Sequence, residues 1–271
     1  MSVLPAGVIP TLKYGQATDK GLRRVLNEDS LLAMDSLIAV ADGMGGHEAG
    51  DVASSLCLKV VADGYAATSG HFTAQSMDQL LARADQEIIN AGSARAGTTL
   101  TGAAIVSVAG AAQWLIFNVG DSRTYRLSGG ILEQVSVDHS EVQELLDSGQ
   151  LTVSQAATYP KRNVVTRALG MRADSRPDYW MLPIDSTDRL MVCSDGLSSE
   201  LGDEQIQEIL RRFLDPQQAA DELVLCALAQ GGRDNVSVIV ADVASAEIDE
   251  PIDVEITVPR ERVEIKIEDG Q

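Results

Sequence analysis

Several signatures of known functional classes are missing from this sequence of 271 residues. The three cysteines, Cys57, Cys193 and Cys226, are an odd number without paired or ligand-like spacing, which argues against a disulfide framework. Each lies in an apolar run, so we expect buried free thiols in a reducing compartment, the cytoplasm. The N-terminal residues lack a basic segment followed by a long apolar stretch, so they do not indicate a signal peptide.

Positive charge is also scarce. Lys and Arg number 21 against 40 Asp and Glu, which gives a net charge of −19. Such a surface repels nucleic acid and anionic membranes, and we expect neither as a partner. It also repels a phosphate dianion, so a phosphate-handling site would need bound cations or a local arginine.

A long uninterrupted hydrophobic run is absent as well. The nearest approach, residues 102–119, contains Ser107, Gln113 and Asn118 and splits at Gly110 into two halves of strand length. Both halves are rich in Ile, Val, Trp and Phe. The pattern favours a buried β-hairpin over a membrane-spanning helix.

The hydrophobic content of 45% is enough for a substantial core. Helical periodicity is found near residues 52–60, 77–88 and 220–228. The strands come in consecutive runs and the helices in pairs, which favours an α+β fold of antiparallel sheets with helices outside. The β-type runs are residues 14–18, 30–33, 37–41, 99–108, 113–119, 124–127, 131–135, 179–182, 190–193 and 236–243.

Two segments stand apart from this pattern. Residues 141–158 predict two short helices broken near Gly149, inserted into the run of strands. Residues 244–271 form an acidic tail in which alternation across 254–267 permits a β-hairpin. A disordered tail and a partner-docking strand remain open for it.

Four aspartates lie beside apolar strands. The run LIAVADGMGGHEAGD places Asp42 at a strand end, followed by Gly43, whose backbone carbonyl could also approach a cation. Asp121 in FNVGDSR and Asp195 in LMVCSDG also follow strands, and Asp234 in GGRDNVSVIV precedes one. A single Asp-Gly pair can be an ordinary turn, but four such aspartates predict convergence on one rim.

The ligand types predict the metal. Carboxylates and a backbone carbonyl, with no Cys or His cluster, suit Mg²⁺ or Mn²⁺ better than zinc, and His47-Glu48 lacks the second histidine of a zincin helix. Arg24 precedes the acidic pair Glu28 and Asp29 and could bind phosphate oxygens. A solvated basic pair with Arg23 is the alternative reading.

Seven blocks now stand in order: RVLNED, ADGMGGHEAGD, GTTLTG, NVGDSR, VTRALG, CSDGL and GGRDNVSV. Together they resemble the metal-dependent serine/threonine protein phosphatases (the PPM family, type 2C) in their compact bacterial form, across residues 14–243. The resemblance implies a four-layer αββα sandwich of two antiparallel sheets flanked by helix pairs. It also implies a catalytic domain at residues 1–243, with a flap at about 138–160 and the tail at 244–271.

The resemblance assigns roles to the metal ligands. Asp42 would bridge two core ions, one of them also held by Asp195 and Asp234 and the other by the Gly43 carbonyl. Asp121, together with Asp195, would recruit a weaker third ion.

It also implies roles for the residues around them. Arg24 would bind phosphate, while Glu28 and Asp29 would act mostly through metal-bound waters, with Asp29 also orienting the nucleophile. Many eukaryotic members have a histidine after the Asp-Gly pair, where this chain has Met44. His47 could cap the first helix or donate a proton, and both readings stay open.

The implied activity is hydrolysis of phosphoserine and phosphothreonine in proteins by a water that bridges two Mg²⁺ or Mn²⁺ ions. No Ser-His-Asp or Cys-Arg nucleophile signature is present in the sequence, and none is required. We expect a monomer that reverses a cognate Ser/Thr kinase in signalling. A non-catalytic phosphoprotein-binding domain and a different two-metal phosphohydrolase are the alternatives.

Overall fold

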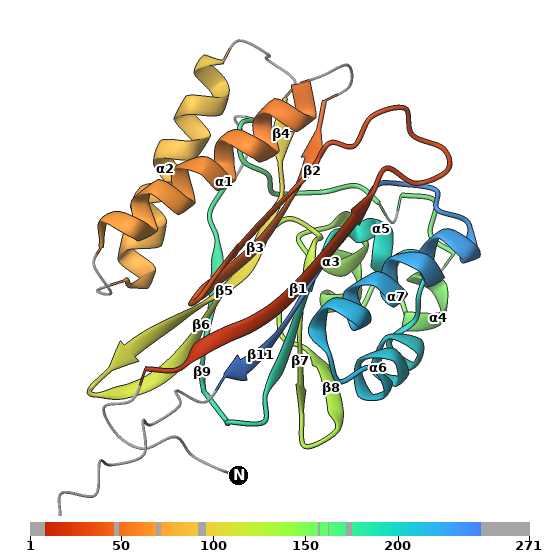
Figure 1. The fold of residues 1–271 in the computed structure, drawn as a ribbon. Helices are drawn as coiled ribbons and strands as arrows, with labels where there is room; N and C mark the ends of the chain where they lie inside the picture. The colour runs from red at the N-terminus through yellow and green to blue at the C-terminus, as the bar shows by residue number, and fades with distance from the viewer. Residues whose placement is uncertain are drawn as a thin grey trace, which may run out of the picture.

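The computed structural model describes residues 9–45, 49–68, 72–91, 96–156, 158–161, 163–171 and 175–244. They form two antiparallel β-sheets packed face to face (Figure 1). The five-stranded sheet has the order β1-β11-β10-β7-β8. Its strands are β1 (Thr11–Asp19), β7 (Arg123–Ser128), β8 (Ile131–Gln134), β10 (Arg189–Cys193) and β11 (Val236–Ala244).

The six-stranded sheet has the order β2-β3-β5-β6-β9, with the short β4 paired to β3 beside this path. Its strands are β2 (Asp29–Met34), β3 (Leu37–Met44), β4 (Gly97–Thr98), β5 (Leu100–Val108), β6 (Ala111–Val119) and β9 (Asp178–Pro183). The chain passes from this sheet to the other between β6 and β7. The turn that contains Asp121 lies at this crossing.

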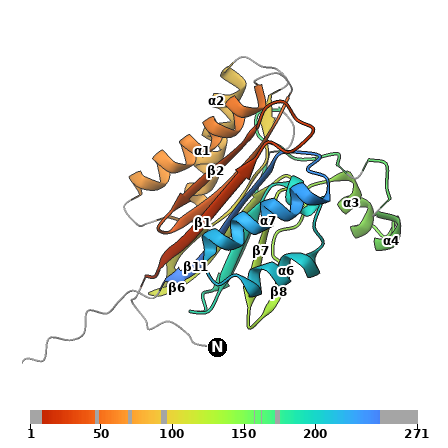
Figure 2. The same cartoon turned by 45° about the vertical axis from the view of Figure 1, so that its right-hand side comes forward.

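Helices cover both outer faces. Residues of α1 (Ala49–Ala67) and α2 (Ala74–Asn90) share a buried cluster with the six-stranded sheet. The other sheet is covered by α5 (Asp195–Ser198), α6 (Asp203–Arg212) and α7 (Pro216–Gln230). The short helices α3 (Glu141–Asp147) and α4 (Val153–Ala156) lie outside the sheets (Figure 2). The predicted α+β class and four-layer αββα sandwich are confirmed.

Alternation along the strands explains the layers. In β3, Leu37 and Ala39 face α1 and α2, whereas Ile38 and Val40 enter the core between the two sheets. Because both faces of the strand are buried, its sequence is an unbroken apolar run. The same division occurs in β11, where Val238 packs toward the helices and its neighbours pack between the sheets.

The ten predicted strands and the paired short helices of residues 141–158 are present. Residues 102–119 form the predicted hairpin, and its turn has positive φ at Ala109 (51°) and Gly110 (82°), as in a type I′ turn. No helix within the described ranges is long and apolar enough to cross a membrane. Strand β4 and helices α5 and α6 were not predicted, and the alternating segment 254–267 lies outside the described residues.

Candidate functional site

Both sheets contribute acidic residues to the same end of the sandwich. Asp29 at the start of β2 lies directly opposite Asp42 of β3 in the antiparallel register. From the other sheet, Asp195 follows β10 as the first residue of α5, and Asp234 comes just before β11. Asp121 lies between β6 and β7. Residues distant in sequence therefore meet because their strands end at a common edge.

Apart from Asp29, these acidic residues line one cavity of about 430 Å³. Asp29 is not on the wall but behind it, where its Oδ2 accepts a hydrogen bond of 2.8 Å from the Ser194 hydroxyl. The predicted convergence is therefore observed. The predicted site residues that line the cavity are Arg24, Glu28, Asp42, Gly43, Asp121, Asp195 and Asp234.

Burial and mutual repulsion raise the pKa values of these carboxyls. Burial raises the pKa of Asp29 to about 7, and hydrogen bonds from two serines oppose the rise. Burial and then the Asp234 charge raise the pKa of Asp195 to about 6. Burial and neighbouring carboxylates place the pKa values of Asp42 and Asp121 well above the usual range. Ionisation of these carboxyls therefore costs free energy in the cation-free protein, and bound cations would remove that cost.

The oxygen donors fit a divalent cation. Among the described residues, the buried Glu28 Oε1 and Asp29 Oδ1 have no hydrogen-bond partner. Carboxylate and carbonyl oxygens without sulfur or imidazole are the donor set of Mg²⁺ or Mn²⁺. However, no three acidic, Cys or His side chains of the described ranges converge in a geometry that would hold an ion. Asp234 Oδ2 is instead bonded to Arg24 Nη2 at 2.6 Å.

Gly43 is constrained by close packing of the backbone. A Cβ at this position would collide with the carbonyl oxygens of Gly50 and Glu28. The Gly43 N–H donates to the Glu28 carbonyl at 3.1 Å, and the Ser54 hydroxyl donates to the same oxygen at 2.6 Å. The glycine thus lets the end of β3, the loop before β2 and the first turn of α1 meet.

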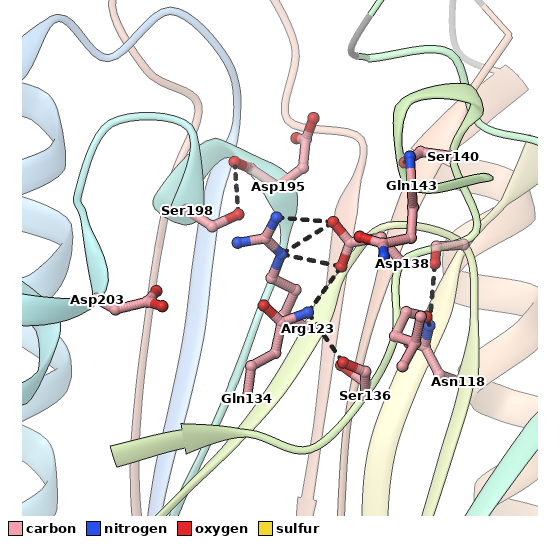
Figure 3. Close-up of polar contacts among 12 residues, drawn as sticks. Asn118, Arg123, Gln134, Ser136, Asp138, Ser140, Gln143, Asp195, Ser198 and Asp203 are labelled. Carbon is pink, nitrogen blue, oxygen red and sulfur yellow. Dashed lines mark hydrogen bonds and ion pairs between the residues drawn. The ribbon is translucent and has the colours of Figure 1, made fainter. Parts of the chain in front are cut away.

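A second cavity, of about 320 Å³, shares Asp121 and Asp195 with the first and extends toward α3 and α4. Figure 3 shows the Arg123 guanidinium bonded to the Asp138 carboxylate, with Nη2 to Oδ2 at 2.7 Å. The positive charge of Arg123 lowers the pKa values of Asp121 and Asp195 and so offsets part of the effect of burial. This ion pair links the base of the predicted flap to the acidic site.

Sequence reasoning assigned no role to Arg167, although it lines the main cavity. Its Nη1 lies 3.0 Å from Asp178 Oδ1 and 3.2 Å from His139 Nε2. The VTRALG block was its only signal in the sequence. His139 Nδ1 accepts the N–H of Gly120 at 3.1 Å, and burial lowers the pKa of this histidine. His139 thus supports the turn that contains Asp121. His47 lies outside the described residues.

Comparison with known proteins agrees with this geometry. The chain is 34% identical over 239 residues to the serine/threonine phosphatase stp of Listeria monocytogenes, covering 83% of this chain and 93% of the relative. It is 38% identical over 251 residues to the serine/threonine protein phosphatase PstP of Mycobacterium tuberculosis, covering 88% of this chain and 46% of that protein.

Solved structures give the same result. A crystal structure of M. tuberculosis PstP matches with a TM-score of 0.81 and 35% identity, covering 87% of this chain and 100% of that one. The catalytic domain of PstP in complex with two manganese ions matches with a TM-score of 0.78 and 35% identity, covering 87% and 99%. The sequence model of the family described as protein phosphatase 2C matches residues 24–230. The chain belongs to the protein phosphatase 2C family.

Proposed function

We propose that this chain hydrolyses phosphoserine and phosphothreonine in proteins with two divalent cations, Mn²⁺ or Mg²⁺. The observation that carries the proposal is the meeting of carboxylates from both sheets around one cavity, with Arg24 on its wall. The named relatives of the chain are serine/threonine phosphatases, and one neighbouring structure contains two manganese ions.

The acidic residues hold the cations. Asp42 would serve both core ions, Asp195 and Asp234 would help to hold one of them, and the Gly43 carbonyl would help to hold the other. Asp121 acts with Asp195 on a weaker third ion. The bound ions supply a nucleophile from solvent at neutral pH and neutralise charge on the phosphate. Support for this division comes from the raised pKa values of the buried carboxyls, since groups that repel one another gain most from a shared cation.

The remaining predicted residues act around the ions. Glu28 and Asp29 would act mostly through metal-bound waters, and each has one buried oxygen without a hydrogen-bond partner among the described residues. Asp29 also orients the attacking water, and its own orientation is fixed by Ser194. Arg24 binds the phosphate oxygens by exchanging its contact with Asp234 for the substrate.

The cellular setting is part of the proposal. The enzyme reverses a cognate Ser/Thr kinase in the cytoplasm and works as a monomer. Residues 1–243 form the catalytic domain, with a flap at about 138–160 that contains α3 and α4. The acidic segment 244–271 is a tail outside this domain.

The test measures phosphate release from a phosphothreonine peptide with Mn²⁺, with Mg²⁺ and with a chelator. Asp42→Asn and Asp195→Asn should each abolish release without loss of the fold. Asp63→Asn is the matched control, since Asp63 is an exposed aspartate on the surface of α1 that pairs with Lys59 at 2.6 Å and does not line the cavity. Activity of either site variant within a few-fold of the wild type would refute the assignment, and no release under any condition would refute the activity.

A further inference from the structure

The GTTLTG block has no part in the proposed chemistry, yet it contacts the site at two points. Thr99 Oγ1 accepts the backbone N–H of Asp42 at 3.0 Å and shares a hydrogen bond of 2.8 Å with the Ser122 hydroxyl. Thr99 and Ser122 have relative exposures of 1% and 0%. A buried pair of hydroxyls therefore connects the backbone of Asp42 to the residue that follows Asp121.

The methyl group of Thr99 contacts the residue on the other side of Asp121. Gly120 has φ +109°, and a Cβ placed on it would lie 2.5 Å from Thr99 Cγ2. The Gly120 backbone therefore packs directly on Thr99. One side chain thus holds both neighbours of Asp121, Gly120 through its methyl group and Ser122 through its hydroxyl.

Asp42 is held by the same block. The Thr99 N–H and the Thr98 hydroxyl both donate to the Asp42 carbonyl, at 2.9 Å and 3.0 Å. Together with the bond to Thr99 Oγ1, the backbone N–H and C=O of Asp42 are both fixed by two consecutive threonines. The position of Asp42 therefore depends on the Gly97–Thr98 strand and on Thr99.

We propose that Thr99 and Ser122 are positioning residues that fix the separation between the Asp42 and Asp121 carboxylates, and thereby the affinity of the site for divalent cations. This inference rests on the proposed function, in which both aspartates are ligands. Thr99 is among the residues that line the main cavity, but its hydroxyl and that of Ser122 are buried and bonded to each other. They act through the backbone of Asp42 and the turn of Asp121, as partners beyond the ligands do in other metal sites.

A second pair of hydroxyls, each two residues further along the chain than Thr99 and Ser122, provides a matched control. Thr101 Oγ1 and Thr124 Oγ1 share a hydrogen bond of 2.9 Å, also buried and also between the two sheets. In the described part of the chain, neither hydroxyl bonds to a proposed ligand. Loss of this bond should cost stability in the same way without moving a carboxylate.

The experiment titrates Mn²⁺ calorimetrically into Thr99→Val, Ser122→Ala, Thr99→Ser and Thr101→Val proteins. Thr99→Val keeps the packing on Gly120 and removes only the hydroxyl, so we expect its Mn²⁺ dissociation constant to rise at least about tenfold, within the range typical of such partners. Ser122→Ala, which removes only the bond between the two hydroxyls, should weaken Mn²⁺ binding in the same direction. The double variant should bind no more weakly than Thr99→Val, which already loses that bond together with the one from the Asp42 N–H. Thr99→Ser should restore affinity to within about threefold of the wild type, and Thr101→Val should remain there.

Urea denaturation in chelator measures the fold without cations. Both Thr99→Val and Thr101→Val should lose stability, but only Thr99→Val should also lose metal affinity. Equal affinity for Thr99→Val and the wild type, or an equal loss for Thr101→Val, overturns the inference while the proposed function stands. If Thr99→Val does not fold, Ser122→Ala decides by the same criterion. Failure of the wild type to bind Mn²⁺ overturns the proposed function and this inference together.

Discussion

Replacing Asp29 by asparagine is expected to stabilise the cation-free protein, and more strongly as the pH rises. Burial raises the pKa of Asp29 from its ordinary value of 3.8 to about 7. Between these two values the folded protein holds a proton that the unfolded chain has lost, so folding stability falls as the pH increases. Asparagine cannot ionise, and it still offers an oxygen to the Ser194 hydroxyl.

The magnitude follows from the two pKa values. With 1.36 kcal/mol per pKa unit, the full penalty at high pH is on the order of 4 kcal/mol, of which about 2–3 kcal/mol develops between pH 5 and pH 8. His139 works in the opposite direction, because burial lowers its pKa and protonation at acidic pH opposes folding. Subtracting the wild-type stability from that of Asp29→Asn cancels this contribution.

The assay is urea denaturation of both proteins in chelator from pH 5 to pH 8. The stability advantage of Asp29→Asn should grow by about 2–3 kcal/mol across this pH range. With Mn²⁺ present, the wild type should instead become more stable as the pH rises, since binding to the folded state strengthens as the ligands lose protons. A pH-independent difference between the two proteins in chelator would refute the reasoning.

Three further predictions concern single side chains. Arg24→Ala should raise KM about tenfold or more with a smaller change in kcat, because the role proposed for Arg24 is to bind phosphate rather than metal; steady-state kinetics with an unchanged KM would remove it from the site. Gly120→Ala forces φ +109° on alanine against Thr99 and should cost at least about 1–3 kcal/mol of stability in chelator. Trp114→Phe removes the 3.0 Å bond from Nε1 to the buried Asp188 and should cost about 1–3 kcal/mol in urea denaturation while kcat/KM stays unchanged.

The fold was largely predictable because each strand is marked in the sequence by a local run of apolar residues. Runs rich in Val, Ile and aromatic residues between glycines predicted the strands of both sheets, and the split at Gly110 predicted the β5–β6 hairpin. Strand β4 consists of two residues, too few for any period to show. Helix α6 has acidic residues in its first turn and basic ones in its last, but only Ile206 and Leu210 are fully buried, so its apolar face is short.

The candidate site residues that directly follow or precede a strand could be predicted from the sequence. Asp42 and Asp195 belong to local patterns of an apolar run followed by Asp-Gly, and ordered blocks elsewhere supplied the resemblance. Thr99 and Arg167 could not be assigned roles in this way. Their importance depends on contacts with Asp42, Ser122 and Asp178, which only the pairing of distant strands creates.

The aliphatic layer between the sheets has a consequence for the chemistry at its end. Asp42 belongs to one sheet and Asp195 follows a strand of the other, so the distance between them depends on how far apart Ile38 and Val40 hold their sheet from Val192 and its neighbours. A bulkier side chain in this layer would spread the sheets and separate the ligands without touching either. We therefore expect the thickness of this hydrophobic layer to influence the metal affinity of the proposed site.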